Sequence, residues 1–177
     1  MTNKIESRLK TLGIELPEPS KPGANYVPYH ISGNLLFLTG QLCHWNGERL
    51  FVGKLGEKFD IQEGQKAARI CGLNLISQLK SALDGNLNLV VRTIKLAGYV
   101  NSSPDFHGQS QVMNGASDLF VEVFENAGMI HSSLWLHYRT HELRKELHYL
   151  IIVRVVKAVH QFSSIPNAKF FISLQYP

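Results

Sequence analysis

Two amphipathic helical segments, separated by one apolar strand, constrain the fold of this chain most strongly. The first segment opens with Asp60 and Glu63, whose spacing matches a capping box, and it ends before Asp84-Gly85. Between these signals, apolar residues recur at helical spacing and would form one buried face: Ala68, Cys71, Leu75 and Leu79. The pattern predicts a helix of about six turns.

The second helical segment follows a strand that we predict over residues 89–100, a stretch rich in β-branched residues. Ser103, Pro104 and Asp105 then provide an N-cap, a proline at the first helical position and an acid in the first turn, and Gly128 provides a stop. The inner face of this predicted helix carries Met113, Ala116, Phe120, Val123 and Ala127.

Shorter signals precede the first long helix. Residues 5–12 predict a short surface helix, and residues 16–23, with three prolines, predict an extended connector. A turn at residues 31–34 precedes a short buried strand at residues 35–39, and an Asn46-Gly47 turn follows; we expect an antiparallel meander. The order strand, strand, helix, strand, helix predicts an α+β fold in which a sheet carries both long helices on one face.

Length and composition agree with one packed domain. The chain has 177 residues, of which 44% are hydrophobic, and it has no run of about 18 apolar residues that would span a membrane. The N-terminal residues lack the apolar segment of a secretory signal, so we expect a cytoplasmic protein with no membrane partner. Cys43 and Cys71 fit neither a disulfide scaffold nor a zinc site, and we expect both to be reduced thiols. Cys43 is either a reactive thiol or an inert buried one.

Positive charge is concentrated near the C-terminal end. Residues 1–129 contain 12 Lys+Arg and 12 Asp+Glu, whereas residues 130–177 contain six and two and therefore carry the whole net charge of +4. Five of the eight histidines also lie in that last stretch. We place a composition break near Met129. We also expect residues 130–148 to be the least ordered part of the chain, because they combine charge and histidines with no clean period.

Several motifs resemble those of the RidA/YjgF family. The string Leu38-Thr39-Gly40-Gln41 is similar to a family strand that ends in a hydroxyl residue followed by Gly-Gln, and Tyr26 lies upstream of it. Asp105-Phe106 and Asn114 are similar to a second family region. Longer strings resemble one subgroup of the family, at residues 12–17, 63–69 and 112–124. The resemblance covers residues 1–129.

The resemblance implies a chorismate-mutase-like α+β fold and a homotrimer with three clefts between adjacent subunits. Members of the family hydrolyse reactive enamines and imines such as 2-aminoacrylate, and some are labelled endoribonuclease L-PSP. By resemblance, Thr39 and Asn114 are the candidate catalytic residues, and Tyr26, Gly40 and Gln41 are the candidate substrate-binding residues. The implied partner is a small-molecule substrate, with no cofactor and no metal. The alternative interpretation is that Gly40 and Gln41 are structural and that Tyr26 is a packing aromatic.

The segment after the second helix departs from the family pattern. The family places a carboxylate-binding arginine there, and in this chain Ser132 and Ser133 occupy that place. One explanation is a frameshift near Met129, since the codons of residues 134–139, shifted by two bases, are compatible with the family's Val-Ala-x-Leu-Pro string. The other is divergence in the normal frame, in which the apolar residues 149–156 supply the family's last strand.

Three functions remain open: an enamine/imine deaminase, a degenerate ligand-binding or interaction subunit, and an endoribonuclease. The missing arginine favours the second. The basic tail lacks regularly spaced aromatics beside its cations, so we do not expect a nucleic-acid partner. A zinc motif starting at His141 would need a histidine at position 145, which is Lys145, although His137 lies four residues before His141. We divide the chain into a domain over residues 1–159, atypical from residue 130, and a tail over residues 160–177.

Overall fold

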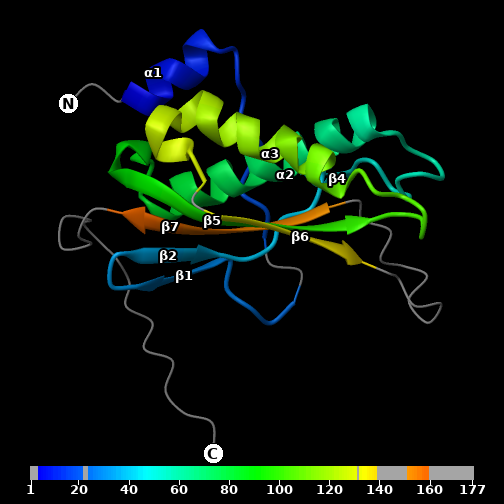
Figure 1. The fold of residues 1–177 in the computed structure, drawn as a ribbon. Coiled ribbons are helices and arrows are strands. Elements are labelled where there is room, and N and C mark those ends of the chain that lie inside the picture. The colour runs from blue at the N-terminus through cyan, green and yellow to red at the C-terminus, as the bar shows by residue number, and fades with distance from the viewer. Residues whose placement is uncertain (1–3, 22–23, 131, 139–150, 160–177) are drawn as a thin grey trace, which may run out of the picture.

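The chain forms a sheet covered by helices (Figure 1). The computed structural model describes residues 4–21, 24–130, 132–138 and 151–159. The elements in chain order are α1 (Lys4–Thr11), β1 (Tyr29–Ser32), β2 (Leu35–Leu38), β3 (His44–Trp45), β4 (Glu48–Arg49), α2 (Ile61–Ala82), η1 (Leu87–Leu89), β5 (Val90–Asn101), α3 (Gln109–Phe124), η2 (Glu125–Gly128), β6 (Ser132–Tyr138) and β7 (Ile151–Val159).

The main sheet has the strand order β1-β2-β7-β5-β6. β7 lies between β2 and β5 and pairs antiparallel with both, whereas β6 pairs parallel with β5. Because β2 and β5 both run opposite to β7, they point in the same direction, as the arrowheads in Figure 1 show. β2 stops earlier along the sheet, since Phe37 and Lys95 both pair with Val156, so β2 ends beside the middle of β5. We call the residues that follow the two strands, 39–41 and 99–102, the β2/β5 end.

All three helices lie on one face of the main sheet, with α2 and α3 side by side (Figure 1). The core between the layers contains Leu36 and Leu38 of β2 and Leu96 and Val100 of β5. The predicted inner faces of both long helices are confirmed except at Ala127, which lies in η2 and is only partly buried. The other predicted residues are buried: Ala68, Cys71, Leu75 and Leu79 of α2, and Met113, Ala116, Phe120 and Val123 of α3. The predicted α+β arrangement, with both long helices on one face, is therefore correct.

Glycines permit the closest approaches within the helix layer. A Cβ added at Gly115 of α3 would lie 2.0 Å from the backbone oxygen of Gln65 in α2. A Cβ at Gly98 of β5 would meet the side chain of Met113 in α3. The two helices and the sheet thus pack at a separation that a larger residue at either position would disturb.

The start of α2 is as the sequence predicts. The Asp60 side chain accepts a hydrogen bond from the Glu63 amide at 2.8 Å, and the Glu63 carboxylate accepts one from the Asp60 amide at 3.0 Å. This reciprocal pair is a complete capping box. At the other end, Asp84 and Gly85 adopt positive φ angles of 49° and 83°, which end the helix.

The predicted start of α3 is wrong. The helix begins at Gln109 rather than at the Ser103-Pro104-Asp105 signal. The physical reason is a long-range contact, because the Ser103 amide donates to the carbonyl of Leu55 at 2.8 Å and so extends the sheet edge past β5. The following residues form a turn in which the Phe106 amide donates to the Ser103 carbonyl. The helix also ends at Phe124, and Gly128 closes the short η2 turn instead.

The meander prediction is correct only in part. β1 and β2 form the expected antiparallel hairpin, but β3 and β4 form a separate two-stranded sheet. The Asn46-Gly47 turn that joins β3 to β4 is confirmed, with φ angles of 48° and 91°. The strand at residues 35–38 is not buried on both sides. Leu36 is fully buried, whereas Phe37 is 39% exposed on the face of the sheet that carries no helix.

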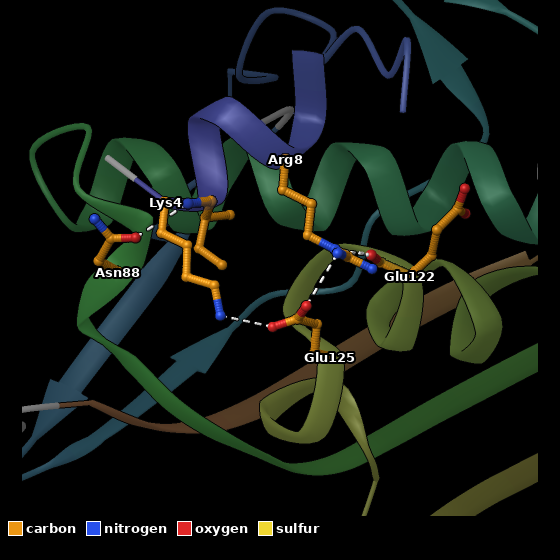
Figure 2. Close-up of polar contacts among 6 residues, drawn as sticks. Lys4, Arg8, Asn88, Glu122 and Glu125 are labelled. Carbon is orange, nitrogen blue, oxygen red and sulfur yellow. Dashed lines mark hydrogen bonds and ion pairs between the residues drawn. The ribbon is translucent and has the colours of Figure 1, made fainter. Parts of the chain in front are cut away.

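The N-terminal helix is held on the helix layer by polar contacts (Figure 2). Lys4 Nζ and Arg8 Nη1 pair with the two carboxylate oxygens of Glu125, at 2.7 and 3.0 Å. Arg8 Nε also donates to the backbone carbonyl of Glu122 at 2.6 Å. Ile5 is buried beneath these contacts. The short surface helix predicted near residues 5–12 is therefore confirmed and is anchored to the C-terminal end of α3.

The atypical C-terminal region contributes two strands to the sheet. β7 takes a central position in the sheet, and it contains residues 151–156 of the apolar stretch that we expected to form the last strand. β6 covers part of the stretch that we expected to be least ordered. Residue 131, residues 139–150, which include Arg139 and His141, and the tail over residues 160–177 lie outside the described residues.

Candidate functional site

Thr39 lies at the β2/β5 end, directly after β2. Its hydroxyl donates a hydrogen bond to the carbonyl of Pro28 at 2.9 Å, and its amide donates to the same oxygen at 3.0 Å. These two contacts join the residues that follow β2 to the residues that precede β1. The hydroxyl proton is thereby directed to Pro28, which leaves the oxygen lone pairs of Thr39 available to accept a hydrogen bond.

Gln41 is buried and its amide group is occupied. Its Oε1 accepts a hydrogen bond from the Ser20 hydroxyl at 2.7 Å, and its Nε2 donates to the Thr39 carbonyl at 3.4 Å. The Ser20 carbonyl in turn accepts from Gln78 of α2 at 2.6 Å. The chain of contacts ties the segment after β2 to the proline-rich connector and to α2. The structure thus gives Gln41 a positioning role, with Gly40 between it and Thr39.

Tyr26 lies on the residues that lead into β1. The Thr39 contact to Pro28 places this segment beside the β2/β5 end. The Tyr26 side chain is 51% exposed, and the neighbouring Val27 is also exposed. Tyr29, the alternative aromatic, is half-buried and packs against the core. Of the two tyrosines, Tyr26 is therefore the one presented to solvent at the β2/β5 end.

Asn114 is not brought into contact with these residues within one chain. It lies in the second turn of α3, on the face of the helix turned away from the core, and it is exposed. Its neighbours Val112, Met113 and Ala116 make the buried contacts instead. Tyr26 and residues 39–41 thus lie on two segments that meet beside the end of β2, whereas Asn114 lies on the outer surface of the helix layer.

Asn101, the last residue of β5, is a polar residue of the β2/β5 end that the sequence interpretation did not select. It is 2% exposed, and its Nδ2 donates to the carbonyl of Gly53 at 3.0 Å. Its Oδ1 is buried and has no hydrogen-bond partner among the described residues. The signal in the sequence was an asparagine at the end of an apolar strand, where asparagine is disfavoured.

A hollow of about 670 Å³ lies at the start of α2, outside the set of predicted site residues. Its apolar walls are formed by Phe59, Ile61 and Phe106. Its charged lining residues are Glu57, Lys58, Asp60 and Glu63. Two of its acids, Asp60 and Glu63, already satisfy the first amides of α2 through the capping box. These carboxylates disfavour a second anion, so the hollow does not suit a carboxylate-bearing substrate.

The two serines that the resemblance places at the family's arginine position lie in a strand. Ser132 and Ser133 open β6 and pair in register with Lys95 and Leu96 of β5. Elsewhere in the described chain, Arg8 and Arg69 form ion pairs with acidic groups of α3 and η2. Neither of these two guanidinium groups is directed to the β2/β5 end.

His44, close to the candidate segment in sequence, lies in β3 opposite Arg49 of β4. Partial burial, and then the positive charge of Arg49, lower the pKa of His44 below its ordinary value. The imidazole is therefore neutral near pH 7. Within the residues that the structure describes, no group of three His, Cys, Asp or Glu side chains is arranged to hold a metal ion. None of the described helices has the length and apolar character needed to cross a membrane.

This chain is similar to a known protein family and to several known proteins. The family model described as "YjgF/chorismate_mutase-like, putative endoribonuclease" matches residues 6–152. "Protein TCP17" of Trypanosoma cruzi is 45% identical over 123 residues, which are 70% of this chain and 76% of that protein.

Two solved structures are also similar. One, from Shewanella oneidensis, carries the same endoribonuclease description; it is 34% identical, covers 88% of this chain and 99% of its own, and superposes with a TM-score of 0.81. The other is Atu1372 of Agrobacterium tumefaciens, described as having unknown function; it is 37% identical, with 88% and 93% of the two chains covered and a TM-score of 0.74.

Proposed function

The chain belongs to the RidA/YjgF family, and from this premise we propose that it hydrolyses reactive enamines and imines of the 2-aminoacrylate type. The observation that carries the proposal is the geometry after β2. The family's hydroxyl position, Thr39, is fixed by two hydrogen bonds to Pro28 at 2.9 and 3.0 Å, and the exposed Tyr26 lies on the same segment as Pro28.

Hydrolysis of an imine requires few groups from the protein. The carbon that bears nitrogen in an imine is electrophilic, so hydrolysis requires that the substrate is held, protonated and presented to water. In the proposed site the Thr39 oxygen accepts a hydrogen bond from the substrate nitrogen or from the attacking water. Tyr26 covers the substrate, while Gly40 and Gln41 fix the backbone around it.

A homotrimer is part of the proposal. The face of the sheet without helices presents Leu35 and Phe37, at 36% and 39% exposure in the single chain. Burying these apolar side chains against other copies would remove them from water. In such an assembly each cleft lies between two subunits, and Asn114 acts only if the α3 helix of a neighbouring copy borders the cleft.

A degenerate ligand-binding subunit is the second candidate function, and the serines at positions 132 and 133 favour it. A substrate carboxylate without the arginine loses hydrogen bonds to a charged group, each of which stabilises by about 1.5–3 kcal/mol. That loss corresponds to roughly ten- to a hundredfold in rate for each bond. Under this second function the chain binds a small ligand but hydrolyses imines no faster than water alone.

The endoribonuclease description belongs to the family model and to the Shewanella oneidensis structure. Residues 1–129 carry no net charge, which gives RNA little electrostatic attraction on the domain that resembles the family. Incubation of the purified chain with single-stranded RNA tests this third function, and cleavage that survives exhaustive purification would favour it over the other two.

The test of the deaminase proposal is a coupled assay. An amino-acid dehydratase generates 2-aminoacrylate, and keto-acid release is followed with and without the purified protein. We expect the wild-type chain to accelerate release and Thr39→Ala to lower kcat/KM by about ten- to a hundredfold. Thr39→Ser keeps the hydroxyl and should retain most of the activity.

Thr11→Ala is the matched control. Thr11 also donates its hydroxyl to a backbone carbonyl, that of Ser7 at 3.1 Å, but it lies on α1 away from the β2/β5 end. It should leave the rate unchanged. Asn114→Ala, assayed in parallel, shows whether the outer face of α3 takes part. Wild-type release equal to that of the protein-free reaction would reject the deaminase in favour of the ligand-binding subunit.

A further inference from the structure

Two thiols meet in the core directly behind the candidate segment. Cys43 lies two residues after Gln41, and Cys71 lies in the middle of α2. Both side chains are fully buried and belong to one apolar cluster. The two thiols hydrogen-bond to each other. Because the Cys43 Sγ donates to the carbonyl of Leu50 at 2.9 Å, its sulfur is the acceptor for the Cys71 thiol.

Asn74 fixes the backbone on both sides of Cys43. Its Nδ2 donates to the carbonyl of His44 at 2.7 Å and also contacts the carbonyl of Leu42 at 3.5 Å. Asn74 lies three residues after Cys71, on the same side of α2. The amide therefore holds the loop that carries Cys43 against the part of α2 that carries Cys71.

We propose that Cys43 and Cys71 are an oxidation site, at which a small peroxide converts the two thiols into a reversible intramolecular disulfide that joins the segment after β2 to α2. A sequence separation of 28 residues and the absence of a Cys-x-x-Cys pattern gave no sign of this pairing. The proposal rests on the contact between the two thiols and on the contacts of Asn74 with the carbonyls on both sides of Cys43. It does not depend on the deaminase activity.

The reaction balances in two steps. The Cys43 thiolate attacks one oxygen of hydrogen peroxide, which breaks the O–O bond and gives a sulfenic acid and water after proton transfer. The Cys71 sulfur then attacks the Cys43 sulfur, and the hydroxyl leaves as a second water. Two thiols are oxidised by two electrons, and one peroxide is reduced to two waters.

The order of attack follows from the positions of the two residues. Burial, and then the contact with Cys43, raise the pKa of the Cys71 thiol, so it stays protonated in the folded helix. Cys43 lies on a loop between short strands, and local opening of that loop exposes it first. Cys71 is then the resolving thiol. Slow oxidation, limited by opening of the loop, is the expected kinetic behaviour.

The disulfide would act on the candidate site through the chain. In the reduced protein the Cys43 thiol is bonded to Leu50, and Thr39 to Gln41 are held by Pro28 and Ser20. Oxidation removes the bond to Leu50 and draws Cys43 towards α2. Residues 39–41 would then be attached covalently to the helix layer, which restricts their movement.

The experiment is oxidation of the full-length chain with hydrogen peroxide, followed by non-reducing peptide mapping and calorimetry. We expect a mass loss of about two daltons and one disulfide-linked peptide that contains both cysteines. On non-reducing gels the oxidised chain should migrate at the size of a monomer, which excludes disulfides between copies. The Tm should rise by roughly 5–10 °C, since a closed loop of this length restricts the unfolded chain. Dithiothreitol should reverse both changes.

Cys71→Ala removes the resolving thiol. In this variant peroxide should stop at the sulfenic acid of Cys43, which a dimedone probe captures, and Cys43→Ala should give no capture. If wild-type chain that remains folded in excess peroxide keeps two free thiols, or forms only disulfides between copies, the proposal is overturned. Capture at Cys71 in Cys43→Ala would overturn the order of attack. The wild-type result decides the disulfide even if a variant fails to fold.

Discussion

The two faces of the main sheet differ more than any other two regions of this molecule. The face under α2 and α3 is lined by fully buried residues such as Leu36 and Leu96, and it forms one continuous core. The opposite face carries no helix (Figure 1). Leu35 and Phe37 are partly exposed on it. The first face is complete within one chain, whereas the second offers apolar surface that one chain does not cover.

The helix-covered face stabilises the fold of one chain, whereas the open face is needed to complete the proposed site. The helix layer needs only local signals and packing, and these are present in a single copy. The residues at the β2/β5 end are positioned by that layer, through contacts such as Gln78 to Ser20. Under the proposed trimer, however, the site is completed only when the open face meets other copies. The variants below test the two faces against each other.

The largest effect is expected from a phenylalanine on each face. Phe120 of α3 is fully buried, so Phe120→Ala should lower the free energy of unfolding by about 3–5 kcal/mol. Phe37→Ala removes the same side chain from the open face and should lower it by less than about 1.5 kcal/mol when measured on the single chain in dilute solution. Urea unfolding of both variants measures the two losses in free energy of unfolding. Equal losses would mean that the two faces contribute alike to the fold.

Gly115→Ala should give the next largest effect. The added methyl group would lie 2.0 Å from the Gln65 oxygen, so α2 and α3 must move apart. We expect a loss of about 1–3 kcal/mol, although alanine is the better helix former. Asp118→Ala on the exposed face of the same helix is the control and should change stability by less than about 0.5 kcal/mol. A stabilised Gly115→Ala variant would contradict the close crossing of the helices.

The capping box of α2 should contribute less. Asp60→Ala removes the acceptor for the Glu63 amide and should cost about 1 kcal/mol. Asp60→Asn keeps an acceptor and should recover most of the loss. Thermal unfolding checks the series. An alanine variant as stable as wild type would show that α2 is held by packing alone.

The smallest effect concerns the attachment of α1. The hydrogen bond and charge of Lys4, and then the charge of Arg8, lower the pKa of Glu125 below its ordinary value of 4.5. A lowered pKa in the folded state contributes stability above the unfolded value, and this contribution is lost as the pH falls through the folded pKa. The protection factors of the α1 amides, which remove the intrinsic pH dependence of exchange, should therefore fall below about pH 4.5. Glu125→Gln should show lower protection factors at neutral pH and little further change on acidification.

Much of the helix layer could be predicted from the sequence because its signals are local. The capping box of α2 and its apolar spacing lie within one segment, as does the Asn46-Gly47 turn, and the structure confirms both. The start of α3 could not be predicted in the same way. Ser103 is a good N-cap residue, but the backbone at this point is still paired with Leu55, a partner 48 residues away in sequence that local patterns do not reveal.

Only the part of the candidate site that lies in one continuous segment could be predicted from the sequence. Thr39, Gly40 and Gln41 are consecutive, and the contact of Thr39 with Pro28 brings them beside the segment that carries Tyr26. Asn114 was selected by resemblance, and helical periodicity alone could have shown that it faces away from the buried positions 113 and 116. Asn101 was missed because its burial depends on Gly53, which comes from a loop far away in sequence.

The most direct test of the central claim measures mass and activity on Phe37→Asp. A charge on the open face should prevent association while the buried face keeps the chain folded. We predict that the wild type sediments at three times the 19.9 kDa of one chain and releases keto acid from 2-aminoacrylate. The variant should sediment as a folded monomer and lose the activity. A wild-type chain that is monomeric and active, or a monomeric variant with full activity, would contradict the account.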